Sequence, residues 1–366
     1  MRQVSRPAKA LVAPNLALTY CFRPLEFMST VVVPPTPSEA TRAAQHIFAV
    51  IAPELSLVEQ EFERQARSNV RVIAMLGNRL QMSGGKRLRP ALTIFANRAV
   101  GGDASRHNVI RMATVMEFLH TATLVHDDII DNATMRRNQP SINGKFGNNI
   151  AVLMGDWLYM SAFETSLAER SLPILTILTK VTRKMVEGEL MQLETKGRSD
   201  VNEELYFEIL QRKTAYLCSA CCEIGAILGD ANAGQQHALE QYGMNLGITF
   251  QLIDDLLDFT SSDEVLGKAT GADLLEGILT LPLIYLLERE PSMRGALETV
   301  MRDRSFKEIP RETLLHMLKK SQSLERAFER AQQFALAAGK ELEALPRSPY
   351  RDLLESLLLF VLARKH

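Results

Sequence analysis

The pattern D-D-x-x-D occurs twice in this chain, each time inside a strongly apolar stretch with helical periodicity. The first copy spans residues 127–131 and the second spans residues 254–258. On a helix, the first and last aspartates of such a motif lie on one face, one turn apart. Like charges this close together in apolar surroundings are costly unless cations neutralise them. The pattern therefore predicts two buried acidic sites on two helices.

Magnesium is the cation that this ligand chemistry favours. Mg²⁺ prefers oxygen ligands, and it commonly takes one or two carboxylates together with waters and substrate phosphates. Two acidic clusters that face each other would clamp a diphosphate through such ions. The predicted metal ligands are Asp127, Asp128, Asp131, Asp254, Asp255 and Asp258. The alternative is a pair of solvated helix faces, but the apolar flanks and the repeated pattern argue against it.

Polar residues continue each acidic face backwards along its helix. His120 and Thr123 lie on the face of Asp127, and Gln251 lies on the face of Asp254. A polar stripe inside an otherwise apolar helix needs either water or a ligand. We therefore expect these three side chains to face the same site as the carboxylates.

Helical periodicity dominates the sequence from residue 39 onward, with glycine and proline breaks and almost no strand-like alternation. We predict a single all-α domain over residues 39–366. The more charged segment 302–366 is interpreted as a peripheral helical layer. Residues 263–277 are rich in glycine and polar side chains, so we interpret them as a mobile lid over the second motif.

The N-terminal segment, residues 1–38, is predicted to be a disordered lead, a mis-called start or a transit segment. It carries four basic residues and no acid before Glu26, which resembles an organellar transit peptide. Met28 is an alternative start. We expect a cytoplasmic protein, or a mitochondrial or other organellar one if residues 1–27 are a transit peptide.

Bulk properties exclude several function classes. The net charge of −1 gives no indication of a nucleic-acid partner. No apolar run is long enough to span a membrane. Three of the four cysteines lie in one apolar helical run and are expected to be buried core thiols, although a soft-metal site is the alternative. The lack of a disulfide pattern favours a reducing compartment.

Basic residues occur at four places that suit phosphate groups. The run G-G-K-R-L-R-P at residues 84–90 places bases after a flexible pair and before a helix start. An arginine pair at residues 136–137 follows the first motif, and K-T at residues 213–214 opens a helix of small residues. Lys268 lies in the predicted lid. Each base alone is more often solvated surface than a ligand.

Taken in order, these motifs resemble those of the trans-isoprenyl diphosphate synthases, in particular their long-chain branch. The matching segments are G-G-K-R-L-R-P, L-H-T-A-T-L-V-H-D-D-I-I-D, M-R-R, K-T, F-Q-L-I-D-D-L-L-D, G-K and D-L-L-E-G. The resemblance covers roughly residues 45–366. It implies about a dozen helices around a deep central cavity, a homodimer, and about three Mg²⁺ ions per site.

The resemblance also implies the reaction and the role of each residue. An allylic diphosphate would ionise, and isopentenyl diphosphate would attack the resulting cation, giving a long-chain polyprenyl diphosphate for quinone side chains. The residues that match the isopentenyl diphosphate site are Lys86, Arg89, His120 and Arg137. Those that match the allylic site are Arg136, Lys213 and Lys268. Thr214 and Gln251 would face the cation, and Gln192 is a weaker candidate.

Chain length is expected to depend on the helix face that precedes the first motif. Residues one and two turns before Asp127 would line the path of the growing chain, and Ala122 and Thr123 are small enough to leave it open. The candidate residues are Phe118, Leu119, Ala122, Thr123 and, as the distant floor, Phe163. We expect a product of about eight to ten isoprene units by family analogy.

One position departs from the family pattern, and two other functions remain open. Ile278 stands where many relatives have a lysine that contacts the diphosphate, so one cation is missing there. A class I terpene cyclase uses a similar aspartate motif, although its second motif is usually not all aspartate. A non-catalytic modulating subunit of a heteromeric synthase usually lacks one or both of the motifs, and both are intact here.

Overall fold

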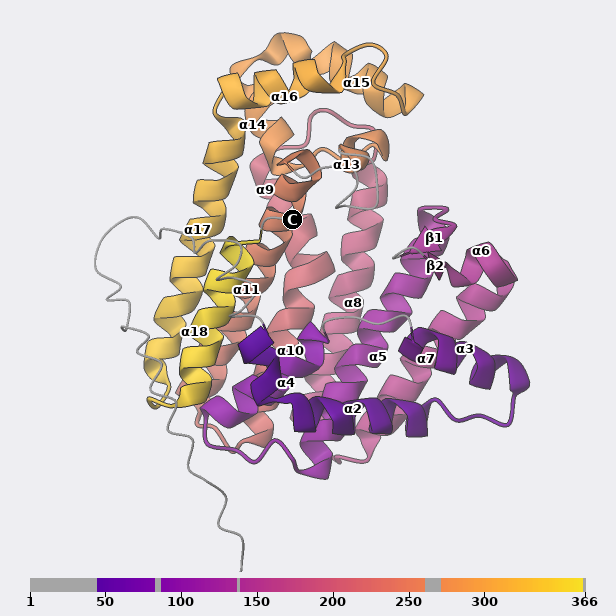
Figure 1. Ribbon diagram of the computed structural model, residues 1–366, viewed down its shortest axis with the longest axis vertical. Helices are drawn as coiled ribbons and strands as arrows, with labels where there is room; N and C mark the ends of the chain where they lie inside the picture. The colour runs from indigo at the N-terminus through magenta and orange to yellow at the C-terminus, as the bar shows by residue number, and fades with distance from the viewer. Residues whose placement is uncertain (1–44, 83–86, 137–138, 261–270, 365–366) are drawn as a thin grey trace, which may run out of the picture. The chain divides into compact units, whose positions relative to one another are not determined.

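The computed structural model describes residues 45–82, 87–136, 139–260 and 271–364, and within these residues it is almost entirely helical (Figure 1). In chain order the elements are α2 (Ala52–Gln65), α3 (Arg71–Met82), α4 (Leu88–Ala99), α5 (His107–Ile130), β1 (Met135–Arg136), β2 (Gln139–Pro140), α6 (Ile142–Phe146), α7 (Asn148–Leu167), α8 (Leu172–Thr195), α9 (Glu203–Leu210), η1 (Gln211–Ala215), α10 (Tyr216–Leu228), α11 (Ala233–Thr260), α13 (Ala272–Leu275), α14 (Leu281–Arg289), η2 (Pro291–Met293), α15 (Arg294–Asp303), α16 (Arg311–Lys320), α17 (Ser323–Glu341), η3 (Leu342–Ala344) and α18 (Pro349–Leu362). The strands form one short antiparallel pair, with Met135 opposite Pro140. The predicted all-α fold class is confirmed.

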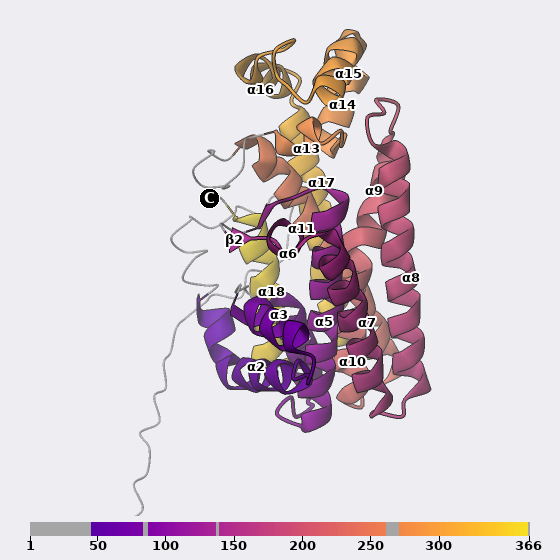
Figure 2. The same cartoon turned by 90° about the vertical axis from the view of Figure 1, so that its right-hand side faces the viewer.

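Helix α5 lies inside the bundle because it is apolar on nearly all sides. It contacts α2, α4, α7 and α10, so that most of its side chains are buried. Helices α10 and α11 pack against each other beside it, and α8 runs along the outer side in Figure 2. This arrangement buries the apolar stretch that precedes the first acidic motif.

Small residues allow α10 to approach α4 and α11 very closely. A Cβ atom on Gly225 would lie 2.4 Å from the carbonyl oxygen of Thr93 on α4, and one on Gly243 would lie 2.6 Å from that of Cys218. Larger side chains at either glycine would push the helices apart. The three cysteines of α10, namely Cys218, Cys221 and Cys222, are free and buried, as the sequence predicted.

Polar side chains cap the starts of several helices. Ser171 accepts a hydrogen bond from the backbone N–H of Ile174 at the start of α8, and Asn202 does the same for Leu205 at the start of α9. Ser348 caps α18, whose first residue is Pro349. These caps satisfy backbone donors that have no partner inside the helix.

The C-terminal segment differs from the predicted peripheral layer. Helix α18 contacts α4, α11 and α17, and Leu354 and Leu357 are fully buried. The prediction was wrong for this helix because its charged neighbours in the sequence masked an apolar face of five leucines and one valine that packs into the core. None of the helices in the described part of the chain combines the length and apolar character needed to cross a membrane.

Several sequence predictions lie outside the described residues. These are the N-terminal lead, Lys86, Arg137, Lys268 and most of the lid at residues 263–277. Its final residues, from Gly271 onward, are described and form the short helix α13.

Candidate active site

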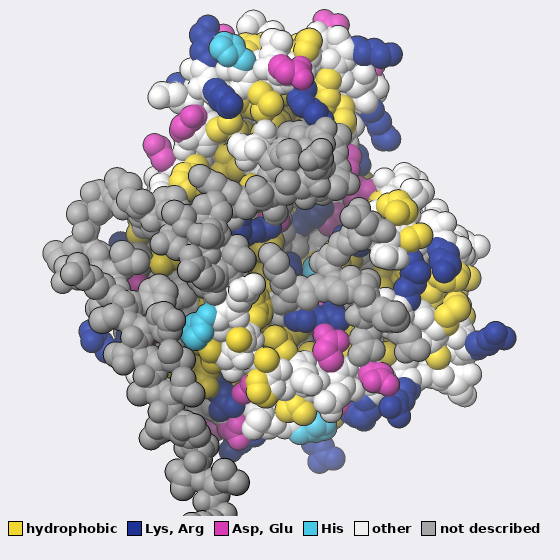
Figure 3. All heavy atoms as spheres, viewed as in Figure 1, with side chains coloured by type: hydrophobic (Ala, Val, Ile, Leu, Met, Phe, Trp, Pro, Cys, Tyr) yellow, Lys and Arg dark blue, Asp and Glu magenta, His cyan; other side chains and the backbone are white. Residues whose placement is uncertain are grey.

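A cavity of about 1660 Å³ runs between α4, α5, α7, α8, η1, α11 and α18. Lys and Arg side chains are visible in the hollowed centre of the face shown in Figure 3. The predicted site residues that line this cavity are Arg89, His120, Thr123, Asp127, Asp128, Arg136, Lys213, Thr214, Gln251 and Asp254. The two aspartate motifs, more than a hundred positions apart in the sequence, therefore line the same cavity.

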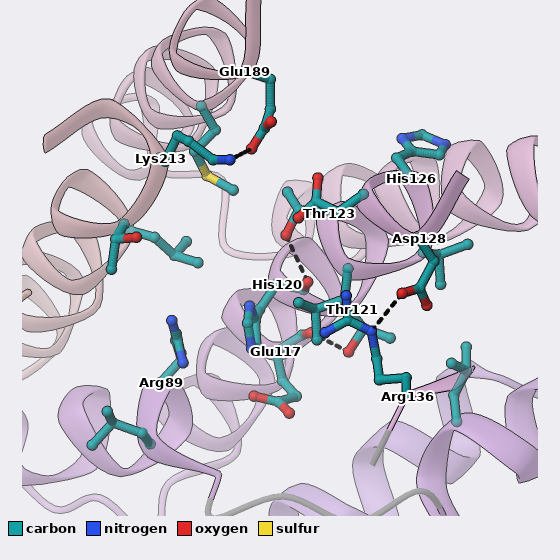
Figure 4. Close-up of a pocket in the computed structure, with 18 of the residues that line it drawn as sticks. Arg89, Glu117, His120, Thr121, Thr123, His126, Asp128, Arg136, Glu189 and Lys213 are labelled. Carbon is teal, nitrogen blue, oxygen red and sulfur yellow. Dashed lines mark hydrogen bonds and ion pairs between the residues drawn. The ribbon is translucent and has the colours of Figure 1, made fainter. Parts of the chain in front are cut away.

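The first acidic motif ends α5 at the edge of this cavity. Asp127 is partly buried, and burial together with the nearby charge of Glu189 raises its pKa to about 7. Asp128 accepts a hydrogen bond from the Nε of Arg136 at 2.8 Å, and burial still raises its pKa. Asp131 ends the helix, and its carboxylate lies 3.5 Å from the Nζ of Lys196. The short β1–β2 pair holds Arg136 against the motif (Figure 4).

The aspartates of the second motif have three different environments. Asp254 lines the cavity, and its carboxylate lies 2.6 Å from a guanidinium nitrogen of Arg364. Asp255 is buried and accepts hydrogen bonds from the hydroxyl of Tyr206 and the amide of Gln251. Asp258 is buried and accepts two backbone N–H groups at the start of α13. Only Asp254 of this motif is a lining residue among those described.

Burial and the charge of Asp273 raise the pKa of Asp255 above its ordinary value, whereas its hydrogen bonds from Tyr206 and Gln251 oppose the rise. A buried carboxyl with two donors is a strongly positioned group, because leaving either oxygen unpaired would cost its desolvation free energy. Asp255 is therefore directed away from the cavity and towards α9.

A one-turn π-helix, η1, places Lys213 and Thr214 in the cavity. Its wider turn interrupts the junction of α9 and α10, which is a common feature of functional sites. Gly188 on α8 makes this possible, because a Cβ there would lie 2.7 Å from the Cβ of Arg212. On the other side, a Cβ on Gly247 would lie 2.6 Å from the Cα of Ala215. Two glycines thus allow α8 and α11 to close around η1.

Lys213 is held by two residues of α8. Its Nζ donates to the Oε1 of Gln192 at 2.7 Å and lies 2.8 Å from a carboxylate oxygen of Glu189. Thr214 donates its hydroxyl proton to the Oε1 of Gln251 at 3.0 Å. The sequence indicated Gln192 but missed Glu189, which lines the cavity beside Lys213 (Figure 4) and whose charge contributes to the raised pKa of Asp127.

The basic start of α4 faces the cavity from the opposite side. Arg89 lines it, and its buried Nε has no hydrogen-bond partner among the described residues. Figure 4 shows Arg89 beside His120, across the cavity from Lys213. A buried guanidinium N–H without a partner fits an anionic ligand, because such a group is costly to leave unsatisfied.

Arg87 anchors this segment. It adopts a left-handed backbone conformation, with φ of 47°, and its guanidinium contacts Glu59 at 2.5 Å and Glu117 at 2.7 Å. These two ion pairs connect α2 and α5 to the start of α4. The sequence indicated a basic helix start, but it did not show that Arg87 forms ion pairs within the fold whereas Arg89 faces the cavity.

Of the residues predicted to control product chain length, only Thr123 lines the cavity among the described residues. Thr123 lines the cavity, and its hydroxyl donates to the carbonyl of His120. Ala122, Leu119 and Phe118 are buried and are not among the lining residues, and Phe118 packs against Phe62 with ring centroids 4.5 Å apart. Phe163 also does not line the cavity. Lining residues that the sequence missed include Tyr159, Met185, Leu217, Phe360 and Arg364.

Asp127 and Asp254 suit a metal ion whose remaining ligands come from a bound phosphate and water. Among the described residues, no three His, Cys, Asp or Glu side chains come close enough to hold a metal ion by themselves. Asp127 and Asp254 nevertheless line one cavity, and the raised pKa of Asp127 indicates a carboxylate that lacks enough compensating positive charge. This is the donor set expected for Mg²⁺, which completes its shell with phosphates and water.

Comparisons with known proteins agree with this geometry. A family model described as polyprenyl synthetase matches residues 70–317. The chain is 36% identical over 314 residues to an octaprenyl diphosphate synthase of Haemophilus influenzae, covering 86% of this chain and 95% of that protein. It is 31% identical to the heptaprenyl diphosphate synthase component 2 of Bacillus subtilis, covering 87% and 90%.

The fold is similar to that of a solved polyprenyl synthase from Caulobacter crescentus, complexed with calcium and isoprenyl diphosphate. The TM-score is 0.82 at 33% sequence identity, and the match covers 88% of this chain and 98% of that one.

Proposed function

Because the chain belongs to the polyprenyl synthetase family, we propose that it condenses isopentenyl diphosphate onto an allylic diphosphate to make a long-chain polyprenyl diphosphate. The observation that carries the proposal is the shared cavity. It joins Asp127 and Asp254, from the two acidic motifs, to Arg89 and Lys213, from two basic segments. An anionic substrate and divalent cations would each find opposite charge there.

Polyprenyl synthases depend on Mg²⁺ as a class, and when bound, the metal supplies positive charge that stabilises a departing diphosphate. We assign Asp127 and Asp254, which line the cavity, as direct ligands, together with Asp131, which lies one turn beyond Asp127 on the same helix face. Asp128, Asp255 and Asp258 are engaged by Arg136, by Tyr206 and Gln251, and by the backbone of α13, so we assign them to positioning. The calcium and isoprenyl diphosphate in the Caulobacter crescentus relative support such a site.

We assign the two groups of basic residues on opposite sides of the cavity to different substrates. Arg89 and His120, with Lys86, would hold isopentenyl diphosphate at the start of α4. Lys213 and Arg136, with Lys268, would hold the allylic diphosphate near Asp127. For Lys213 this requires exchange of its contacts with Glu189 and Gln192 for diphosphate oxygens. Thr214 and Gln251 line the cavity between these two groups of residues, where their oxygens would stabilise an allylic cation by their dipoles.

A long product fits the cavity. Its volume of about 1660 Å³ exceeds the roughly 300–1,000 Å³ of common small-molecule sites, and apolar side chains from α5, α7, α8 and α10 line it. The relatives, octaprenyl and heptaprenyl diphosphate synthases, also support a long-chain product. We infer that the product serves as a quinone side-chain precursor.

Homodimer formation would cover an exposed apolar face on α7 and α8. Leu153, Met160 and Leu167 recur every seven residues along α7 and are 57–67% exposed, and Leu172 on α8 is 76% exposed. Residues seven apart lie on one side of a helix, so these side chains form a stripe. An apolar stripe of this length usually marks a protein interface. We assign it to a second copy of this chain.

One experiment separates this function from the alternatives. Purified protein is incubated with Mg²⁺, isopentenyl diphosphate and allylic primers, and the products are sized. The proposal predicts chains much longer than the primer. A terpene cyclase would consume the primer without isopentenyl diphosphate, and a modulating subunit would give no product alone.

A further inference from the structure

The second aspartate of the second motif connects the cavity to a buried tyrosine on α9. The hydroxyl of Tyr206 donates to the Oδ2 of Asp255 at 2.6 Å, and the Nε2 of Gln251 donates to the Oδ1 at 2.9 Å. The Oε1 of Gln251 in turn accepts the hydroxyl proton of Thr214 at 3.0 Å. Four side chains from α9, η1 and α11 thus form one continuous chain of hydrogen bonds.

The hydrogen bonds of this chain converge on Asp255: the two on the cavity side run from Thr214 through Gln251 to its Oδ1, and Tyr206 donates to its Oδ2 from α9. With both carboxylate oxygens accepting, the amide N–H of Gln251 must point to Asp255 and its oxygen to Thr214. The hydroxyl proton of Thr214 is then committed to Gln251. The lone pairs of its oxygen are left for the cavity, which Thr214 and Gln251 both line.

We propose that Tyr206 and Asp255 are positioning residues that fix the direction of this chain, so that the Thr214 oxygen presents its negative end to the allylic cation. The inference rests on the proposed function. Dipoles that are already oriented stabilise a developing charge without reorganising at the moment of reaction. Tyr206 is well suited to this task because its ring is buried and packs edge-on against Phe207, with centroids 5.4 Å apart.

The structure also explains why a carboxylate is needed at position 255. In Asp255→Asn one acceptor becomes an N–H₂ donor. If Tyr206 still donates to the remaining oxygen, Gln251 must turn its amide over to accept from the asparagine. Its own N–H₂ group then faces Thr214, whose hydroxyl proton is released towards the cavity. The variant keeps the number of hydrogen bonds but reverses the dipoles.

The test compares kcat, KM and the Mg²⁺ requirement of Tyr206→Phe and Asp255→Asn with those of the wild type. Tyr206→Phe should lower kcat by about three- to tenfold, the effect of one hydrogen bond, with KM and Mg²⁺ dependence unchanged. Asp255→Asn should lower kcat further, again at unchanged Mg²⁺ dependence. If either variant instead raises the Mg²⁺ requirement, Asp255 acts as a metal ligand and the inference fails.

Tyr242→Phe is a matched control. Tyr242 is also a fully buried tyrosine, lies on α11 like Gln251, and donates its hydroxyl to the carbonyl of Leu354 at 2.8 Å. The Tyr242→Phe variant should lose about as much stability as Tyr206→Phe but keep the kcat of the wild type. Equal kcat losses in both tyrosine variants would overturn the proposal.

A double-mutant cycle tests the connection itself. In a Thr214→Val background, which removes the hydroxyl, Tyr206→Phe should have little further effect on kcat, because the two changes act through one chain. Additive losses of kcat would show that the two residues do not act through one chain of hydrogen bonds. Absence of product from the wild type would instead refute the proposed function and leave the stability comparison with Tyr242→Phe unaffected.

Discussion

Replacing Asp127 with asparagine should stabilise the metal-free protein at neutral and alkaline pH while abolishing its activity. Burial, with Glu189 as the second cause, raises the pKa of Asp127 to about 7 from an ordinary value of 3.8. Between these two values the folded protein holds a proton that the unfolded chain has lost. Stability from this group is therefore lost as the pH rises through this window, and the loss is complete above about pH 7.

The magnitude follows from the two pKa values. One pKa unit corresponds to about 1.4 kcal/mol, so the ionised carboxyl destabilises the fold by roughly 4 kcal/mol at most. Asp127 faces the cavity and is partly exposed, so solvent screening reduces this figure, and we expect about 2–4 kcal/mol. For a chain of this size that corresponds to roughly 3–6 °C in Tm. Asparagine has the same shape without the charge.

Thermal unfolding in a chelator, at about pH 5 and pH 8, checks this expectation for the wild type and Asp127→Asn. The variant should gain stability at the higher pH and approach the wild type at the lower one. Asp303→Asn, at an exposed aspartate on α15, is the control and should change stability by less than about 0.5 kcal/mol at either pH. If Asp127→Asn is no more stable than the wild type at the higher pH, the carboxyl is not under the electrostatic strain inferred here.

Three further expectations follow from the site. Thr123→Phe should shorten the product, because its ring would fill part of the cavity that Thr123 lines, and an unchanged product distribution would refute that wall assignment. Arg89→Ala should mainly raise KM for isopentenyl diphosphate, whereas Lys213→Ala should impair the allylic partner, and identical effects on both substrates would refute this division. Leu153→Asp should give a monomer in light scattering, and an intact dimer would place the interface elsewhere.

Helical periodicity was sufficient to predict the fold class and the faces of the two acidic motifs. His120, Thr123, Asp127, Gln251 and Asp254 all line the cavity, as their spacing along each helix indicated. Such spacing is local information, because residues three and four apart on a helix share a face whatever the helix packs against.

Contacts between distant segments could not be read in this way. Arg364 reaches Asp254 from α18, and Tyr206 reaches Asp255 from α9, and neither pair is related by any spacing in the sequence. The π-helix η1 also leaves no recognisable pattern in its own sequence, because it depends on the close approach of Gly188 and Gly247 from two other helices. For the same reason, the sequence treated all three aspartates of the second motif alike, although only Asp254 is a lining residue among those described.

The most direct test of the central claim is the turnover of Asp127→Ala, Asp254→Ala and the double variant with Mg²⁺ and both diphosphates. Because the two carboxylates are proposed to act as one clamp, each single variant should lose on the order of 10³-fold or more in kcat. The double variant should lose far less than the product of the two single losses. Near-native turnover of either single variant, with its fold intact, would contradict the account.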